Sequence, residues 1–261
     1  EGLIYYNIND VKETKKFAHY SMPAIDFRVG LIGTIPGDVL NFNDTKIGAK
    51  LLETRLGEDV CYERSNSGRK VKRQTFRSEI ALRDIIFPYV QFKHPEFRRI
   101  HDWMLHEKIV SSDITDPEAD LVTKGAFKGV VANVGGMDFH FGTGGIHGSV
   151  PKQFVQATDE YDIEDIDVAA LYPNIAIVNG LYPEHLGEAF THEYSKLPME
   201  RKEWQAKKGK KCTEANSIKL SSNGTYGNSN SKFSIFYDPK FTMTITINGQ
   251  LLLCMLAEWV L

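Results

Sequence analysis

The sequence predicts an α+β fold, in which helices and strands occupy separate stretches of the chain. Helical periodicity is visible in residues 79–110 and 241–261, and acidic and apolar residues alternate with a period of two from Tyr161 to Ala170. Hydrophobic residues make up 42% and charged residues 25% of the 261 residues, which are ordinary values for a globular chain. This composition excludes a disordered tail, a collagen and a disulfide-stapled miniprotein.

The first 110 residues contain two stretches with a helical pattern. Residues 1–20 predict a helix with Asp10 near its start, and residues 22–60 contain enough glycine and proline to predict short elements joined by turns. Residues 79–110 predict a helix that is broken at Pro88 and Pro95.

A basic stretch lies between these segments, in residues 61–78. It is consistent with a solvated loop or with phosphate contacts, since phosphate binding requires cations but no particular geometry. It contains five cations with no acid between them, Arg69, Lys70, Lys72, Arg73 and Arg77.

The second half of the chain predicts one strand and three helices. The alternation from Tyr161 to Ala170 predicts the strand, and Pro173 predicts the first turn of a helix. Residues 214–225 predict a second helix, and residues 196–211 carry seven Lys or Arg against two Glu. Residues 241–261 begin with β-branched residues and become a helix with one apolar face, formed by Ile247, Leu251, Leu252, Met255, Leu256 and Trp259.

Net charge, cysteines and apolar runs place further limits on function. The 31 Lys and Arg against 34 Asp and Glu give a formal charge of −3, so a nucleic-acid site would require an uneven distribution of charge. Cys61, Cys212 and Cys254 have no metal-ligand spacing, which predicts reduced thiols. The most apolar run, Leu251–Leu256, is too short to span a bilayer, and no secretory signal opens the sequence. We therefore expect a cytoplasmic protein without membrane contact.

Both ends of the sequence predict that the chain is a piece of a longer polypeptide. It begins at Glu1 without an initiator Met, already in an apolar stretch, and it ends at Leu261 within a helical pattern. No Gly, Asn or Pro stop signal and no basic last turn precede that end.

Four carboxylates follow one another in the predicted strand: Asp162, Glu164, Asp165 and Asp167. In a strand, Asp165 and Asp167 would point to the same face. A carboxylate at a strand end before a helix can hold a hard cation, and the alternative is a solvated edge strand protected by charge.

Two motifs connect this region with a known family. Asp167–Pro173 reads DVAALYP and resembles DxxSLYP, motif A of the family B DNA polymerases. Lys219–Gly227 reads KLSSNGTYG and resembles KxxxNSxYG, motif B on the fingers helix of that family. The motifs occur in the family's order with a basic helical segment between them.

Two further segments fit the same resemblance. Phe141–Gly145 is similar to the YxGG motif that links the exonuclease and polymerase regions, and Tyr6–Asp10 is similar to YxxxD, the third exonuclease motif. The segment from Asn228 to Leu251 resembles bacteriophage members of the family. The sequence departs from the family where Ala170 and Gly224 replace Ser and where Phe141 replaces Tyr.

The resemblance implies a role for each matching residue. Asp167, with the carbonyl of Val168, would bind Mg²⁺, two ions of which serve the complete enzyme. Lys219 and Arg201 would hold the triphosphate. The implied nucleotide-binding residues are also Leu171, Tyr172, Asn223 and Tyr226, and the Tyr172 ring would exclude a 2′-hydroxyl. The implied DNA-binding residues are Gly144, Gly145 and Gly227. Tyr6 and Asp10 would be an exonuclease remnant.

The glycines of residues 125–150 match no phosphate-binding loop. No Gly-Lys-Ser/Thr follows Gly142, and His147 stands where GxGxxG requires its third glycine. The resemblance favours backbone contact with a template strand. His140 and His147 are a weak metal pair, and solvated or structural histidines are the alternative.

The implied fold is a partial polymerase palm, an antiparallel sheet with helices, beside helical fingers and the end of a ribonuclease H-like exonuclease domain. The implied domains are the exonuclease end in residues 1–20, an exonuclease-to-palm linker with helices in 21–130, the palm in 131–190, the fingers in 191–231, and a return to the palm in 232–261.

The implied function is template-directed nucleotidyl transfer from a dNTP to a primer 3′-hydroxyl, with primer-template DNA and the rest of the polymerase chain as partners. Motif C, the source of the second carboxylate, is absent, so we expect the isolated chain to be catalytically incomplete. One alternative is a non-catalytic nucleic-acid-binding module that uses Arg69–Arg77 and Lys207–Lys211. Another is a metal-dependent 3′–5′ exonuclease resting on Tyr6 and Asp10, which would need upstream carboxylates.

Overall fold

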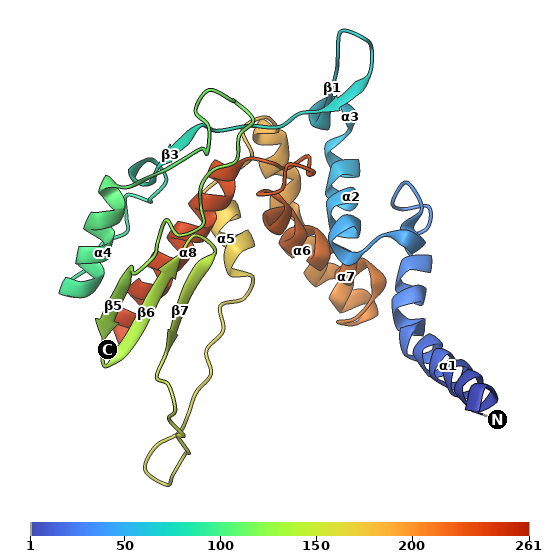
Figure 1. Cartoon of the computed structure of the whole chain (residues 1–261), viewed down its shortest axis with the longest axis horizontal. Coiled ribbons are helices and arrows are strands. Elements are labelled where there is room, and N and C mark those ends of the chain that lie inside the picture. Colours follow the sequence, from blue (N-terminus) through green and yellow to red (C-terminus); the bar gives the residue numbers. More distant parts are fainter. Residues whose placement is uncertain (1, 261) are drawn as a thin grey trace. The chain divides into compact units, whose positions relative to one another are not determined.

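The computed structural model describes residues 2–260 of the chain (Figure 1). Within these residues the protein is α+β, with eight α-helices and three small antiparallel sheets, and about half of it is helical. The predicted α+β class is therefore confirmed, and its finer division into palm, fingers and exonuclease end stays a prediction. The chain forms two compact units, unit 1 from residues 1–58 and 196–225 and unit 2 from residues 59–195 and 226–261. The five predicted domain boundaries stay predictions.

Unit 1 is helical. The predicted N-terminal helix is confirmed as α1 (Gly2–Val29), which continues beyond residue 20 and contains Pro23. After the short 3₁₀ helix η1 (Val39–Asn41), residues 22–60 depart from the prediction, because α2 (Asp44–Leu56) is a regular helix of 13 residues. The remainder of the unit comes from parts of α6 (Gly187–Lys208) and α7 (Thr213–Asn228).

Local signals that the turn-based interpretation overlooked explain α2. The Asn43 side chain accepts a hydrogen bond of 2.8 Å from the Lys46 amide, which caps the first turn, and Gly57 ends the helix with a positive φ of 86°. Gly48 is needed for packing, because a Cβ there would overlap the carbonyl oxygen of Leu220 on α7. The glycine therefore brings two helices into contact and does not mark a turn.

All three antiparallel sheets belong to unit 2. They are β1 (Tyr62–Arg64) with β2 (Lys70–Lys72), β3 (Glu79–Ala81) with β4 (Lys108–Val110), and β5 (Val131–Val134) with β6 (Met137–Gly142) and β7 (Gly145–Ser149) in sequence order.

The helical prediction for residues 79–110 is wrong in its first half and at its end, where β4 lies. Residues 79–84 form β3 and the 3₁₀ helix η2 (Leu82–Asp84), and the regular helix is α4 (Pro95–His106). Pro95 does not break a helix. It begins one, since its missing N–H and fixed φ suit the first helical position. The basic stretch is likewise not a plain loop, because β1 and β2 form a hairpin within it.

A central helix provides much of the unit 2 core. α8 (Pro239–Val260) packs against α5 (Leu171–Val178) and β7 (Figure 1). It is helical from Pro239, so the β-branched residues at the start of the predicted stretch belong to the helix as well. Of its predicted apolar face, Ile247 and Leu251 are buried, whereas Trp259 is 83% exposed.

α8 is also long and apolar enough to cross a membrane, but 56% of its most apolar window is buried inside the protein. A core helix of a soluble protein satisfies the same criteria, so α8 is weak evidence for a membrane span. The absence of membrane contact stays a prediction.

The predicted strand from Tyr161 to Ala170 does not form. Residues 161–170 contain neither helix nor strand, and all ten are exposed to solvent. A strand needs a partner for its backbone hydrogen bonds, and Ile163 and Ile166 remain 57% and 72% exposed, so alternation alone does not produce one here. Asp165 and Asp167 therefore do not share a strand face.

The helices predicted before and after the basic residues 196–211 are confirmed. Pro173 lies in the first turn of α5, whose preceding residue, Ala170, has a left-handed backbone with φ of 49°. Residues 214–225 belong to α7.

No disulfide joins the three cysteines, and burial raises the pKa of the Cys254 thiol to about 12.

Candidate functional site

Tyr172 is the residue around which several predicted site positions meet, all of them in unit 2. It is the second residue of α5, and its ring stacks on that of Tyr226 with the centroids 4.5 Å apart and the planes at 29°. Tyr226 belongs to the last turns of α7, 54 positions later in the sequence. The motif A-like and motif B-like segments are thus in direct contact through their two tyrosines.

One glycine makes room for the Tyr172 side chain, and a second lies in contact distance of it. A Cβ on Gly249 of α8 would lie 3.1 Å from a carbon of the Tyr172 ring, which is closer than ordinary van der Waals contact. A Cβ on Gly145, where β7 begins, would lie 3.6 Å from the Tyr172 hydroxyl. The ring is therefore held between α8, the start of β7 and the ring of Tyr226.

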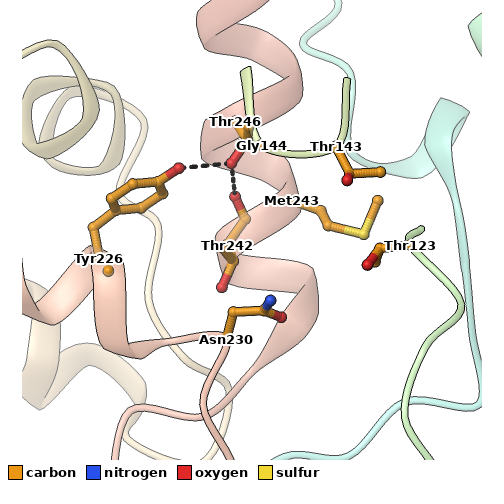
Figure 2. A pocket seen from close by; sticks show the side chains of 9 residues that line it. Thr123, Thr143, Gly144, Tyr226, Asn230, Thr242, Met243 and Thr246 are labelled. Atoms are coloured by element: carbon orange, nitrogen blue, oxygen red, sulfur yellow. Dashed lines mark hydrogen bonds between the residues drawn. The ribbon is translucent and has the colours of Figure 1, made fainter. Parts of the chain in front are cut away.

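Two consecutive hydrogen bonds orient the Tyr226 side chain against α8. Its hydroxyl lies 2.8 Å from Oγ1 of Thr246, and the Thr246 hydroxyl donates in turn to the carbonyl oxygen of Thr242 at 2.9 Å (Figure 2). Since Thr246 has only one hydroxyl proton, Tyr226 is the donor of the first bond. Burial raises the pKa of Tyr226, so this phenol is neutral at physiological pH.

A pocket of about 220 Å³ opens beside Tyr226 (Figure 2). Two of the glycines predicted to contact DNA, Gly144 and Gly227, line it together with Tyr226. No charged residue is present in its wall, which offers hydroxyls, an amide and a thioether. This chemistry suits an uncharged polar group and not a triphosphate. The lining residues are Thr123, Thr143, Gly144, Tyr226, Gly227, Asn230, Thr242, Met243 and Thr246.

The turn that carries Gly144 is anchored from α8. Gly142 pairs with Gly145 across the β6–β7 hairpin, which leaves Thr143 and Gly144 as its two turn residues. The buried Gln250 amide brackets Gly142, donating to its carbonyl oxygen at 2.8 Å and accepting from its N–H at 3.2 Å. Gln250 therefore satisfies backbone groups at the hairpin end and holds the turn against the helix.

Sequence reasoning assigned no role to Gly249, Gln250 or Thr246. The first two are adjacent polar or small residues inside an otherwise apolar helical stretch, and all three lie on α8. That interruption is the signal that could have found them, since a buried polar residue in a core helix requires a partner.

Asp167 has a different environment from the residues around Tyr172. It is exposed, in the segment without regular structure that precedes α5. Within residues 2–260 there is no group of three or more His, Cys, Asp or Glu side chains that could hold a metal ion. The residues that the structure describes therefore do not assemble a two-ion site, and Mg²⁺ binding by Asp167 and the Val168 carbonyl stays a prediction.

Three further predicted ligands or pocket residues belong to unit 1. Lys219 and Asn223 are exposed and lie one turn apart on α7. Arg201 on α6 is half-buried, and its Nε atom has no hydrogen-bond partner among the described residues. Because Asp167 belongs to unit 2, its convergence with Lys219 on one nucleotide stays a prediction.

The residues of the exonuclease remnant and of the histidine pair are all exposed to solvent. Tyr6 and Asp10 are exposed on α1. His140 and His147 are directly opposite each other across β6 and β7, and both are exposed. They are neighbours that the sequence alone did not predict, but they offer a metal only two ligands.

Comparisons with known proteins identified no relative of this chain. No protein-family model, no curated protein and no solved structure matches the chain. The resemblance to family B DNA polymerases is therefore carried by the short motifs alone.

Proposed function

We propose that this chain is the part of a family B DNA polymerase that runs from the end of the exonuclease domain through motif A and motif B, with unit 2 supplying part of a palm and the last turns of α7 belonging to the fingers. The observation that carries the proposal is the stacking of Tyr172 on Tyr226, beside Gly145. Three segments that were singled out separately, for one site, contribute neighbouring residues. Their proximity supports a shared site.

The surroundings of Tyr172 suit the selection of a deoxyribonucleotide. Its ring is confined by Gly249, Gly145 and Tyr226, so it can move little to admit a larger ligand. An aromatic ring that cannot yield leaves no space for a 2′-hydroxyl at a sugar that rests on it. Tyr172 would therefore act by steric exclusion, and Leu171 precedes it at the start of α5.

The uncharged pocket beside Tyr226 suits the base or the sugar and not the phosphates. Cations for a triphosphate would come from Lys219 and Arg201, and Asn223 would help to shape the base pocket. Asp167 offers one carboxylate toward Mg²⁺, and nucleotidyl transfer would need another from outside the described residues. The proposed partners are primer-template DNA, a dNTP and the remainder of the polymerase chain.

Saturation-transfer NMR on the purified chain tests the nucleotide site, because it detects weak binding. We expect transfer to the base and sugar protons of dATP, and less transfer to ATP. Replacement of the confined ring by Tyr172→Ala removes the steric exclusion and brings the two signals together.

The matched control is Tyr20→Ala, which removes a tyrosine that is 86% exposed on α1. It leaves the difference between dATP and ATP unchanged. The proposal fails if none of the four dNTPs receives transfer, or if Tyr172→Ala keeps the preference for dATP.

A further inference from the structure

The β1–β2 hairpin concentrates positive charge on a two-stranded ribbon in unit 2, drawn in cyan in Figure 1. Its loop is closed by hydrogen bonds from the Ser65 amide to the Arg69 carbonyl at 2.9 Å and from the Gly68 amide to the Ser65 carbonyl at 2.8 Å. Gly68 supports this turn with a φ of 76°. Residues 62–73 contain one carboxylate, Glu63, against five cations, Arg64, Arg69, Lys70, Lys72 and Arg73.

Strand register places three of these five cations on one face. Arg64 pairs with Lys70 and Tyr62 pairs with Lys72, and paired residues of an antiparallel ribbon project to the same side. Glu63 and Val71 form the intervening pair, which projects to the other side. The face of Arg64, Lys70 and Lys72 therefore carries cations and the Tyr62 ring, over which the Lys70 amine lies at 3.9 Å from the centroid.

Three of the cations keep their charge uncompensated by an acid. Arg69, Lys72 and Arg73 are all exposed, and none of them forms an ion pair within residues 2–260. The Lys72 amine donates to the carbonyl oxygen of Phe233 at 2.7 Å, which orients it without neutralising it. Three exposed cations without an ion-pair partner favour the approach of an anion.

We propose that this hairpin binds the phosphodiester backbone of DNA through Lys72 on that face, Arg69 directly before β2 and Arg73 directly after it. Phosphate contacts depend on cations and not on a base sequence, and a two-stranded ribbon is narrow enough to enter a DNA groove. Polar side chains at the tip, Ser65, Asn66 and Ser67, can donate further hydrogen bonds to phosphate oxygens. An anionic membrane is a poorer fit, since the tip has no apolar side chain to insert.

This proposal does not depend on the nucleotide site, because the hairpin shares no residue with the pocket beside Tyr226. A recess of about 460 Å³ beside the hairpin is lined by Lys72 and Arg73 but also by Glu63 and Glu118. Its mixed charge is unfavourable for phosphate, so the proposed contact is with the ribbon and not with the recess.

Fluorescence anisotropy with labelled oligonucleotides tests the hairpin, with salt varied between about 50 and 200 mM and no nucleotide present. The variant Arg69→Gln/Lys72→Gln/Arg73→Gln removes three cations. We expect the slope of log Kobs against log salt for duplex DNA to become less negative by about 2.7, which corresponds to three lost phosphate contacts.

The matched control is Lys12→Gln/Lys15→Gln/Lys16→Gln, which removes three exposed lysines from α1 and changes the net charge equally. It keeps the wild-type slope. Arg69→Lys/Lys72→Arg/Arg73→Lys, which preserves the charge, also keeps the slope, and circular dichroism verifies that each variant is folded.

Duplex and single-stranded oligonucleotides are measured in parallel, and loss of binding to either one in the glutamine variant supports the phosphate contact. An equal loss in the α1 control, or an unchanged slope in the hairpin variant, would overturn the proposal. So would a loss of binding to phosphatidylserine vesicles without a loss of binding to DNA. No nucleotide is present in this assay, so its outcome is separate from a failure of the nucleotide site.

Discussion

Glycine at position 249 decides how closely Tyr172 can approach α8. In the middle of a helix, alanine is ordinarily more stable than glycine by about 0.5–1 kcal/mol. Here a Cβ would come within 3.1 Å of the Tyr172 ring, and the stack on Tyr226 limits the ring's retreat. The close contact therefore outweighs the gain in helix propensity.

We expect Gly249→Ala to lower the free energy of unfolding by about 1 kcal/mol, the lower end of the cost of overpacking a core. Urea denaturation followed by circular dichroism measures this change. A stabilised variant would show that Tyr172 has room to move and would weaken the argument for steric selection.

Gly224 provides the matched control for this substitution. It also lies inside a helix, α7, but a Cβ there would be 3.6 Å from the nearest atom, the carbonyl oxygen of Thr45, an ordinary van der Waals distance. Gly224→Ala should raise stability by about 0.5–1 kcal/mol. The same space explains how the family's serine could be accommodated where this sequence has glycine.

At the scale of elements, His185 ties together segments that have no regular structure of their own. Its Nδ1 lies 2.9 Å from the Thr75 hydroxyl and its Nε2 lies 2.7 Å from the Ile235 carbonyl oxygen. The carbonyl can only accept, so Nε2 carries the proton and Nδ1 accepts from Thr75. The ring thus joins the chain after β2 to the loop between α7 and α8.

Stability should depend on the protonation of this histidine. Burial lowers the pKa of His185 and Arg73 acts in the same direction, whereas the Ile235 carbonyl, Asp238 and Glu184 act against it. With the folded pKa below the unfolded value of about 6.5, the unfolded chain binds more protons as the pH falls. The contribution of His185 is therefore fully present above about pH 6.5 and is lost at lower pH.

The expected result is a urea midpoint that falls when the pH is lowered from about 7.5 to about 5.5, with a smaller fall in His185→Gln. The same measurement on His101→Gln provides a comparison with a second histidine, because burial also lowers the pKa of His101. A pH dependence that is the same in wild type and His185→Gln would contradict this assignment.

At the scale of the whole molecule, the placement of the carboxylates bears on the prediction that the isolated chain is catalytically incomplete. Two-metal phosphoryl transfer needs several ligands held around a pair of ions, and residues 2–260 bring no group of three or more together. We expect no primer extension when the purified chain is given primer-template, dNTPs and Mg²⁺. Gel electrophoresis of a labelled primer measures this, with an unrelated complete polymerase as the positive control, and extended primer in the chain's own reaction would contradict it.

Local pattern was sufficient for several elements and for two residues of the candidate site. Periodicity predicted α1 and α7, and Pro173 predicted the start of α5, because these signals act within a few residues. Tyr172 and Tyr226 were both identified from short motifs. Local pattern failed for residues 161–170, where an alternating sequence had no neighbouring strand with which to pair.

The sequence by itself determined the fold class, most of the helices and the concentration of cations in residues 61–78, since composition and periodicity are properties of short stretches. Only the tertiary structure decided that Tyr172 stacks on Tyr226, that Gly249 makes room for the ring, and that Gln250 holds the β6–β7 turn. These are contacts between residues far apart in the chain, formed when α8 is buried against α5 and β7. A polar or small residue inside an apolar helix signals that a partner exists, but only packing shows which partner it is.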